Sequence, residues 1–174
     1  MDWTREEHPV WDAEKQRIIG GAPEGAFVLL FADGDELPGE WWSARDEAGA
    51  VVGYGRLDIG WGGDAEILLA VDPDRQQQGV GSFVLGHLEQ EAAGRGINYV
   101  YNTIRDHEAR DLVHDWLVVR GFRGSVDGDL RKRVVPYEPV GATAAPAPFH
   151  RDTGDRAPGQ EEQGGYVDVD EHRY

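Results

Sequence analysis

A polar loop with two glycines is the segment of the chain best suited to chemistry. The apolar run Ala65–Val71 ends at Asp72-Pro73, and an amphipathic stretch begins after the loop Gln76, Gln77, Gln78, Gly79, Val80, Gly81 and Ser82. Glycine lets a backbone approach a ligand closely, and a helix start offers free N–H groups and the positive end of the helix dipole. A strand, this loop and a helix in that order predict a site for phosphate or pyrophosphate.

Two common phosphate-binding motifs do not fit this loop. A Walker A motif needs a lysine directly after its last glycine, and no lysine follows Gly79 or Gly81. A dinucleotide fingerprint needs a third glycine, where Val84 stands. The run Gln76-x-x-Gly79-x-Gly81, placed after a strand and Asp72-Pro73, resembles the acyl-CoA pyrophosphate loop of the GNAT superfamily of N-acyltransferases.

The resemblance covers about residues 51–122 and implies a fold and a co-substrate. The fold is α+β, with a twisted, mixed and mostly antiparallel sheet flanked by helices. Strands over residues 65–71 and 97–104 would separate, and acetyl-CoA would lie in the gap, with no metal. Backbone groups of Leu69 and Val71 would pair with pantetheine amides, and the N–H groups of residues 76–82 would hold the pyrophosphate.

The resemblance also implies where a catalytic base would lie, since an amine must lose a proton before it attacks. The family often places that base on the strand before the CoA loop. Asp64 and Glu66 lie there on one face, because strand side chains alternate. We expect Glu66 to be the base, with Asp64 as the alternative, and Tyr101 on the next strand as the candidate acid. Each residue also has a plainer explanation. Glu66 would be an exposed carboxylate at a sheet edge, Asp64 a turn residue, and Tyr101 a ring packed in the core.

Two positions of the second helix depart from the family. Its pattern is often Asn-x-x-Ala-x-x-x-Tyr-x-x-x-Gly-Phe. Counting back from Gly121-Phe122, Leu117 takes the tyrosine position and Arg110 takes the asparagine position. The usual acid that protonates the departing thiolate is therefore missing. Arg110 fits either a contact with CoA or a surface ion pair, and the nearby His107 and His114 are more simply explained as surface residues.

Hydrophobic periodicity predicts the elements that would position these residues. Helical patterns cover residues 9–19, 79–93 and 106–120, and Gly121 is expected to cap the last helix. Strand-like runs cover residues 26–31, 40–46, 50–57, 65–71, 97–104 and 129–135, with residues 2–5 as the alternative first strand. The runs 40–46 and 50–57 flank a short turn with Gly49 and predict a β-hairpin.

Composition restricts the partners. The 174 residues contain no cysteine and carry a net charge of −16, from 17 Lys and Arg against 33 Asp and Glu. This balance disfavours nucleic acid and anionic membranes, and it is compatible with a cationic acceptor. The longest apolar run, residues 26–32, is far shorter than the ~20 residues of a membrane helix. The N-terminus lacks an apolar leader segment, so we expect a cytoplasmic protein.

The composition changes near Pro136, which predicts a folded domain over residues 1–137 and a tail over residues 138–174. The tail is rich in Pro, Gly, Ala and acidic residues and is expected to be largely disordered. It holds eight acidic and three basic residues, a net −5, so the remaining −11 belongs to residues 1–137. Residues 166–174 alternate like a short strand, which either adds to a sheet edge or frays.

The resemblance to the GNAT superfamily thus implies an enzyme that transfers an acetyl group from acetyl-CoA to a primary amine by direct attack in a ternary complex. The acceptor would be a small molecule or a peptide. A longer acyl donor is the alternative within the same fold. The alternative from another class is a non-catalytic acyl-CoA-binding or interaction module, because the usual tyrosine is absent. The sequence is compatible with a homodimer as well as with a monomer.

Overall fold

The computed structural model describes residues 1–124 and 128–134. The predicted tail, residues 138–174, lies outside the described residues. The elements are β1 (Asp2–Glu6), α1 (Ala13–Ile18), β2 (Glu40–Arg45), β3 (Val51–Ile59), β4 (Ala65–Val71), a 3₁₀ turn (Pro73–Arg75), α2 (Val80–Gly94), β5 (Tyr99–Asn102), α3 (Arg110–Val118), β6 (Arg123–Gly124) and β7 (Leu130–Arg133).

One mixed sheet organises the described residues. Its strand order is β1-β2-β3-β4-β5-β7-β6, and every neighbouring pair is antiparallel except β4 and β5, which run parallel. The predicted fold class, a mixed and mostly antiparallel sheet with helices, is confirmed. Of the two alternatives for the first strand, the N-terminal one is right, because β1 pairs along β2 from Asp2 to Glu6.

The hairpin of β2 and β3 forms where it was predicted. One carboxylate oxygen of Asp46 accepts hydrogen bonds from the N–H groups of Ala48 and Ala50, both at 3.0 Å, and Gly49 supplies a positive φ of 81°. Trp41 and Trp42 are both buried and belong to different core clusters, because successive side chains of a strand point to opposite faces.

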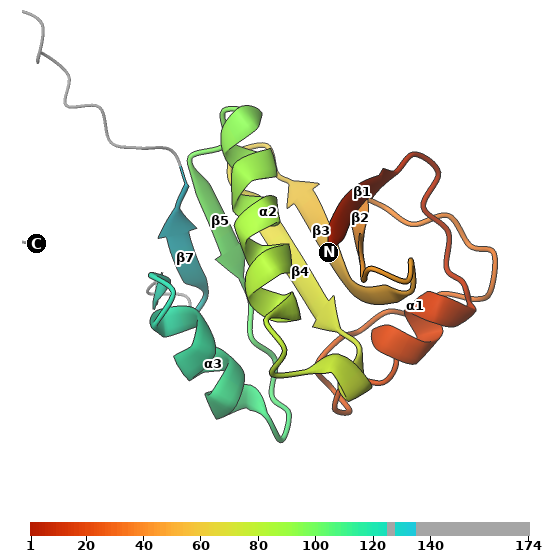
Figure 1. Cartoon of the computed structure of the whole chain (residues 1–174). Coiled ribbons are helices and arrows are strands. Elements are labelled where there is room, and N and C mark those ends of the chain that lie inside the picture. The colour runs from red at the N-terminus through yellow and green to blue at the C-terminus, as the bar shows by residue number, and fades with distance from the viewer. Residues whose placement is uncertain (125–127, 135–174) are drawn as a thin grey trace, which may run out of the picture. The chain divides into compact units, whose positions relative to one another are not determined.

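Two apolar cores cover the two faces of the sheet. The larger core joins α2 and the buried Leu117 of α3 to strand residues such as Trp42, Ile67 and Val100. The smaller core joins α1 to Trp41 and Leu68 on the opposite face. In Figure 1, α2 lies in front of β4 and β5. The sheet is thus a middle layer, and any ligand between β4 and β5 would touch elements of both faces.

The N-terminal helix and the strand expected after it need correction. The helix begins at Ala13, because Val10 forms a β-bridge with Glu36 and Asp12 caps the helix by accepting a hydrogen bond from the Lys15 N–H at 2.8 Å. The apolar run 26–31 is wrong as a strand, since it is irregular and pairs with no strand in the part of the chain that the structure describes.

Two further elements are shorter than predicted. The strand over residues 97–104 is reduced to β5, and the helix over residues 106–120 is reduced to α3. The expected glycine cap is confirmed. Gly121 has a φ of 98°, and the N–H of Phe122 bonds back to the carbonyl of Leu117 at 3.2 Å, which returns the Phe122 ring to the core. Within residues 1–124 and 128–134, no helix has the length and apolar character to cross a membrane.

Candidate active site

The parallel strands β4 and β5 separate soon after they pair. Their register contains only Ala65 opposite Val100 and Glu66 opposite Tyr101. One residue further along β4, the side-chain amide of Asn102 donates a hydrogen bond to the main-chain carbonyl of Ile67 at 3.0 Å. β5 ends at Asn102 whereas β4 continues to Val71, and in Figure 1 the segment after β5 leads away from β4 toward α3. The sheet therefore contains an opening along the second half of β4.

Among the described residues, the second half of β4 has no pairing strand on the side of this opening. The N–H of Asp72 bonds to the carbonyl of Val52 at 2.9 Å, which makes that pair a hydrogen-bonded one. Hydrogen-bonded and non-bonded pairs alternate along an antiparallel ladder. The N–H and C=O groups of Leu69 and Val71 consequently point away from β3 and into the opening, as the Ile67 carbonyl does toward Asn102.

The loop after β4 leads into a helix whose first N–H groups are free. Gln77 and Gly79 have positive φ angles of 61° and 84°, and Gly79 caps α2 without a side-chain hydrogen bond. The first N–H bond back into the helix comes from Phe83, to the carbonyl of Gly79 at 3.0 Å. Among the described residues, the N–H groups of Val80, Gly81 and Ser82 therefore lack acceptors and suit an anion.

Two ion pairs hold this loop against the rest of the domain. Arg75 bonds to Asp46 of the β2–β3 turn at 2.9 Å, and that bond together with the turn N–H groups lowers the pKa of Asp46. Arg17, just before the end of α1, bonds to Asp72. Partial burial by itself raises the pKa of Asp72, but the bonds from Arg17 and from the N–H of Asp74 outweigh it and lower that pKa.

Arg120 is a functional candidate that the sequence analysis missed. Its guanidinium carbon lies 3.8 Å from the centre of the Trp116 ring, and one nitrogen donates to the hydroxyl of Ser82 at 3.0 Å. This contact places a fixed positive charge beside the free N–H groups of α2. A cation four residues after a tryptophan near a helix end is a sequence signal for such stacking, but it does not by itself reveal the contact with Ser82.

One large cavity connects the opening to this loop. Its volume is about 690 Å³. Of the twelve site residues predicted from the sequence, eight line it: Glu66, Leu69, Val71, Gln76, Gln77, Gly79, Gly81 and Ser82. Residues 26–29, from the run mistaken for a strand, also line the cavity, as do Asn102, Trp116, Arg120 and Arg56.

Glu66 lies in the cavity wall beside an arginine. Its carboxylate is 3.7 Å from a terminal guanidinium nitrogen of Arg56, and its side chain is 36% exposed. Leu68 follows on the same strand face. The face carrying Glu66 is the one covered by the α1 core, opposite α2. A carboxylate that is partly exposed to the cavity can accept a proton from a bound amine.

The other four predicted residues do not line the cavity. Asp64 precedes β4 and bonds to Arg131 of β7 at 3.1 Å. Tyr101 lies beside Glu66 in the strand register, and burial, helped by the Glu66 carboxylate, raises the pKa of its phenol. Gln78 accepts a bond from Arg75 at 3.0 Å, and the side chain of Val80 is buried in the core.

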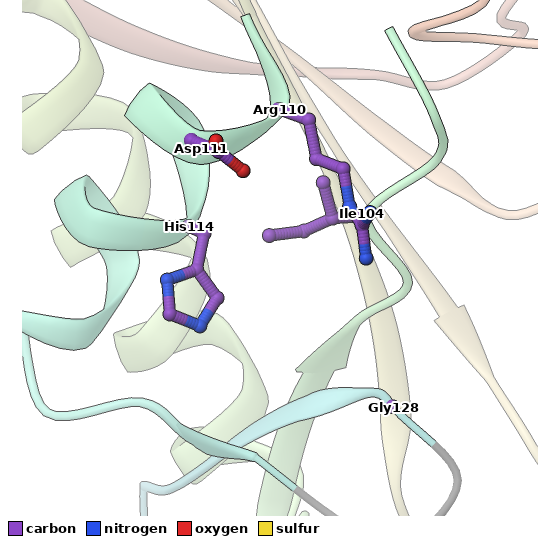
Figure 2. A pocket seen from close by; sticks show the side chains of 5 residues that line it. All are labelled: Ile104, Arg110, Asp111, His114 and Gly128. Atoms are coloured by element: carbon purple, nitrogen blue, oxygen red, sulfur yellow. The ribbon is translucent and has the colours of Figure 1, made fainter.

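The two histidines near α3 lie in different places. His107 lines the large cavity, and its Nδ1 accepts a hydrogen bond from the Ala109 N–H at 3.2 Å. His114 lines a separate cavity of about 260 Å³ with Arg110 and Asp111. Figure 2 shows these three side chains on α3, with that of Arg110 extending to Ile104 and the His114 ring pointing downward in the view. Neither histidine lies on the strand that carries Glu66. Arg110, like His114, lines the small cavity and not the large one.

Comparison with known proteins gives one family match. The sequence model of the family described as "Acetyltransferase (GNAT) family" matches residues 1–116. No curated protein matches the sequence significantly. The matched segment contains β1 to β5, the loop with Gly79 and Gly81, and most of α3.

Several solved structures resemble part of the chain. A phosphinothricin acetyltransferase from Sinorhizobium meliloti in complex with AcCoA is 18% identical, with a TM-score of 0.48, over 66% of this chain and 70% of that one. An IAA acetyltransferase from Bacillus cereus ATCC 14579 is 19% identical, with a TM-score of 0.48, over 55% and 77%. A PaiA N-acetyltransferase from Thermoplasma acidophilum in complex with coenzyme A is 18% identical, with a TM-score of 0.46, over 53% and 59%.

Proposed function

Because this chain belongs to the acetyltransferase (GNAT) family, we propose that it transfers an acetyl group from acetyl-CoA to a primary amine. One observation carries the proposal. The unpaired half of β4, the glycine loop and the free first turn of α2 all border one cavity of about 690 Å³. An extended amide chain ending in a pyrophosphate matches this series of backbone donors and acceptors.

The co-substrate would be held mainly by backbone groups. The N–H and C=O groups of Leu69 and Val71 would pair with the pantetheine amides as a further strand would. The N–H groups of residues 80–82 would bind the pyrophosphate at the positive end of the α2 dipole. Arg120, fixed between Trp116 and Ser82, would add a charge-assisted hydrogen bond to a phosphate.

Glu66 is the base that we assign, since it is the predicted carboxylate that lines the cavity. It would take a proton from the acceptor ammonium, directly or through a water molecule. The nitrogen lone pair would then attack the thioester carbonyl carbon, the new C–N bond would form, and the C–S bond would break. The sulfur would leave with the electron pair of that bond, and the new amide nitrogen would lose its second proton to water.

The departing thiolate does not require a tyrosine at the family's usual position. Leu117 occupies that position and is buried in the core, so it contributes no proton. Thiols ionise near pH 8.5, so a thiolate is a stable leaving group that can take its proton from water. Tyr101 and Asp64 lie outside the cavity lining. We therefore assign them to the polar surroundings of Glu66 and not to contact with the substrates.

The buried Leu117 also favours a second candidate function, a module that binds acyl-CoA without turnover. The test mixes the protein with acetyl-CoA, a panel of primary amines and a thiol reagent that reports free CoA. The enzyme is supported by amine-dependent CoA release that a Gly81→Asp variant loses. Binding of acetyl-CoA by calorimetry, with release no faster than in the absence of protein for every amine, would support the module instead.

A further inference from the structure

Arg56 of β3 lies in the wall of the large cavity, and its guanidinium group is fixed in position by its neighbours. It lies in register between Trp41 of β2 and Leu68 of β4, and its side chain is only 13% exposed. Its guanidinium carbon lies 5.8 Å from the centre of the Trp41 ring. Its aliphatic stem packs on Gly39, where an added Cβ would come within 3.2 Å of Arg56 Cδ. These contacts fix the position of the charge.

This guanidinium has unused hydrogen-bonding capacity. Its Nε is buried and has no partner, and its terminal nitrogens form no hydrogen bond with the described residues. The carboxylates of Glu66 and Asp58 are 3.7 and 4.0 Å away, which gives electrostatic attraction without a hydrogen bond. A mostly buried guanidinium with free donors is costly unless a ligand supplies acceptors.

The phosphates of CoA are poorly placed to be that ligand. Arg56 shares a sheet face with Leu68, which lies three residues before the end of β4, or roughly 10 Å at the usual rise per residue. That face is the one covered by the α1 core, whereas the pyrophosphate loop leads into α2 on the other face. Arg56 is instead the neighbour of Glu66, the base that we assign to the acceptor amine.

We infer that the acceptor is an amine that also carries a carboxylate, of the α-amino acid class, and that Arg56 binds this carboxylate. The inference rests on the proposed function. A carboxylate offers the paired acceptors that match a guanidinium fork. An α-amino acid bears its ammonium and carboxylate on one carbon, which suits Glu66 and Arg56 as adjacent partners of opposite charge. The lining charges agree: besides Arg120, which we assign to the phosphates, Arg56 and Arg105 line the cavity, and Glu66 is the one carboxylate among the described lining residues.

The decisive experiment compares each free α-amino acid of a panel with its own carboxamide, which keeps the amine and the side chain. We expect kcat/KM to be about 100-fold higher for the preferred amino acid than for its carboxamide, as for loss of a charged hydrogen-bonding partner. In Arg56→Gln this ratio should fall to about 1. In Arg56→Lys, which keeps the charge and loses the fork, it should be intermediate. Arg5→Gln removes an exposed arginine of β1 and should keep the wild-type ratio.

Binding measurements separate the two proposals. Calorimetry on the CoA-bound protein should detect the preferred amino acid in wild type, with the affinity lost in Arg56→Gln, even if turnover fails. Binding of this kind without CoA release would overturn the acetyltransferase proposal and retain the carboxylate site. Two results would overturn the carboxylate site and retain the enzyme. One is equal kcat/KM for amino acids and their carboxamides. The other is efficient acetylation of peptide N-termini, with the ratio of kcat/KM for amino acid and carboxamide unchanged in Arg56→Gln. Thermal melting shows whether each variant is folded.

Discussion

The side-chain amide of Asn102 reaches across from β5 to the main-chain carbonyl of Ile67 on β4, at 3.0 Å. It takes the place of the next ladder hydrogen bond, just beyond the pair of Glu66 and Tyr101. Without it, the Ile67 carbonyl would face the opening with no protein donor. This bond therefore marks the closed end of the gap in which the thioester would lie.

Replacement of Asn102 by Ala tests this relationship. We expect the free energy of unfolding to fall by about 1–3 kcal/mol, because the partly buried Ile67 carbonyl loses its donor. Urea denaturation measures the change. The matched control is Asn98→Ala, whose side chain is exposed and has no hydrogen bond among the described residues, and its effect should stay within about 0.5 kcal/mol. Equal effects of the two variants would show that the bond does not stabilise the gap.

Replacement of Glu66 by Gln tests the base. Turnover should fall by about 10²-fold or more while the affinity for CoA stays unchanged, because a general base contributes on that order. Stopped-time assays of CoA release and calorimetry give the two quantities. Asp58→Asn is the matched control, since Asp58 also lies beside Arg56 but is not among the residues lining the cavity. Near-normal turnover in Glu66→Gln would contradict its role as the base and assign the proton transfer to water.

Replacement of Gly81 by Asp tests the pyrophosphate site. The new side chain would put a negative charge at the start of α2, and its Cβ would already lie 3.3 Å from the Trp116 ring. We expect calorimetry to show no CoA binding by a variant that still melts cooperatively. Gly86→Asp is the control, because it makes the same change later in α2, where nothing lies within 4 Å of the new Cβ. Unchanged CoA affinity in a folded Gly81→Asp would contradict the site.

The parts of the site that depend on local sequence were predictable. The apolar run of β4 and the two glycines after it determine a strand, a loop and a helix start through local periodicity and backbone freedom. The run 26–31 was wrongly predicted as a strand because residues 26–29 line the cavity instead of pairing in a ladder, and an apolar composition is the same in both cases. Arg56 and Arg120 were missed because an isolated arginine has the same local pattern on a surface as in a cavity wall. Only the pairing of β3 with β2 and β4, and the approach of α3 to Ser82, give them their positions.

The pair of Arg17 and Asp72 gives the domain a predictable response to acid. Asp72 joins the end of β4 to α1 and also accepts the N–H of Asp74 at 3.0 Å, so it fixes the start of the CoA loop. Its pKa in the folded protein is lowered, chiefly by the Arg17 bond acting against burial. A carboxylate with a lowered folded pKa stabilises the protein fully above its unfolded pKa, about 3.9 for Asp. This stabilisation is lost as the pH falls through the lower, folded value.

Urea midpoints measured from pH 7 to pH 2 should therefore show a specific difference between the wild-type protein and Asp72→Asn. The variant should be less stable at pH 7 by a margin that stays constant down to about pH 5, then shrinks below the ordinary Asp pKa and disappears once Asp72 is protonated in the folded state. Glu47→Gln, in the exposed β2–β3 turn, is the control and should follow the wild-type curve. A margin that persists unchanged at pH 2 would mean that Asp72 acts through packing and not through its charge. A margin absent at pH 7 would mean that the bond to Arg17 adds nothing to stability.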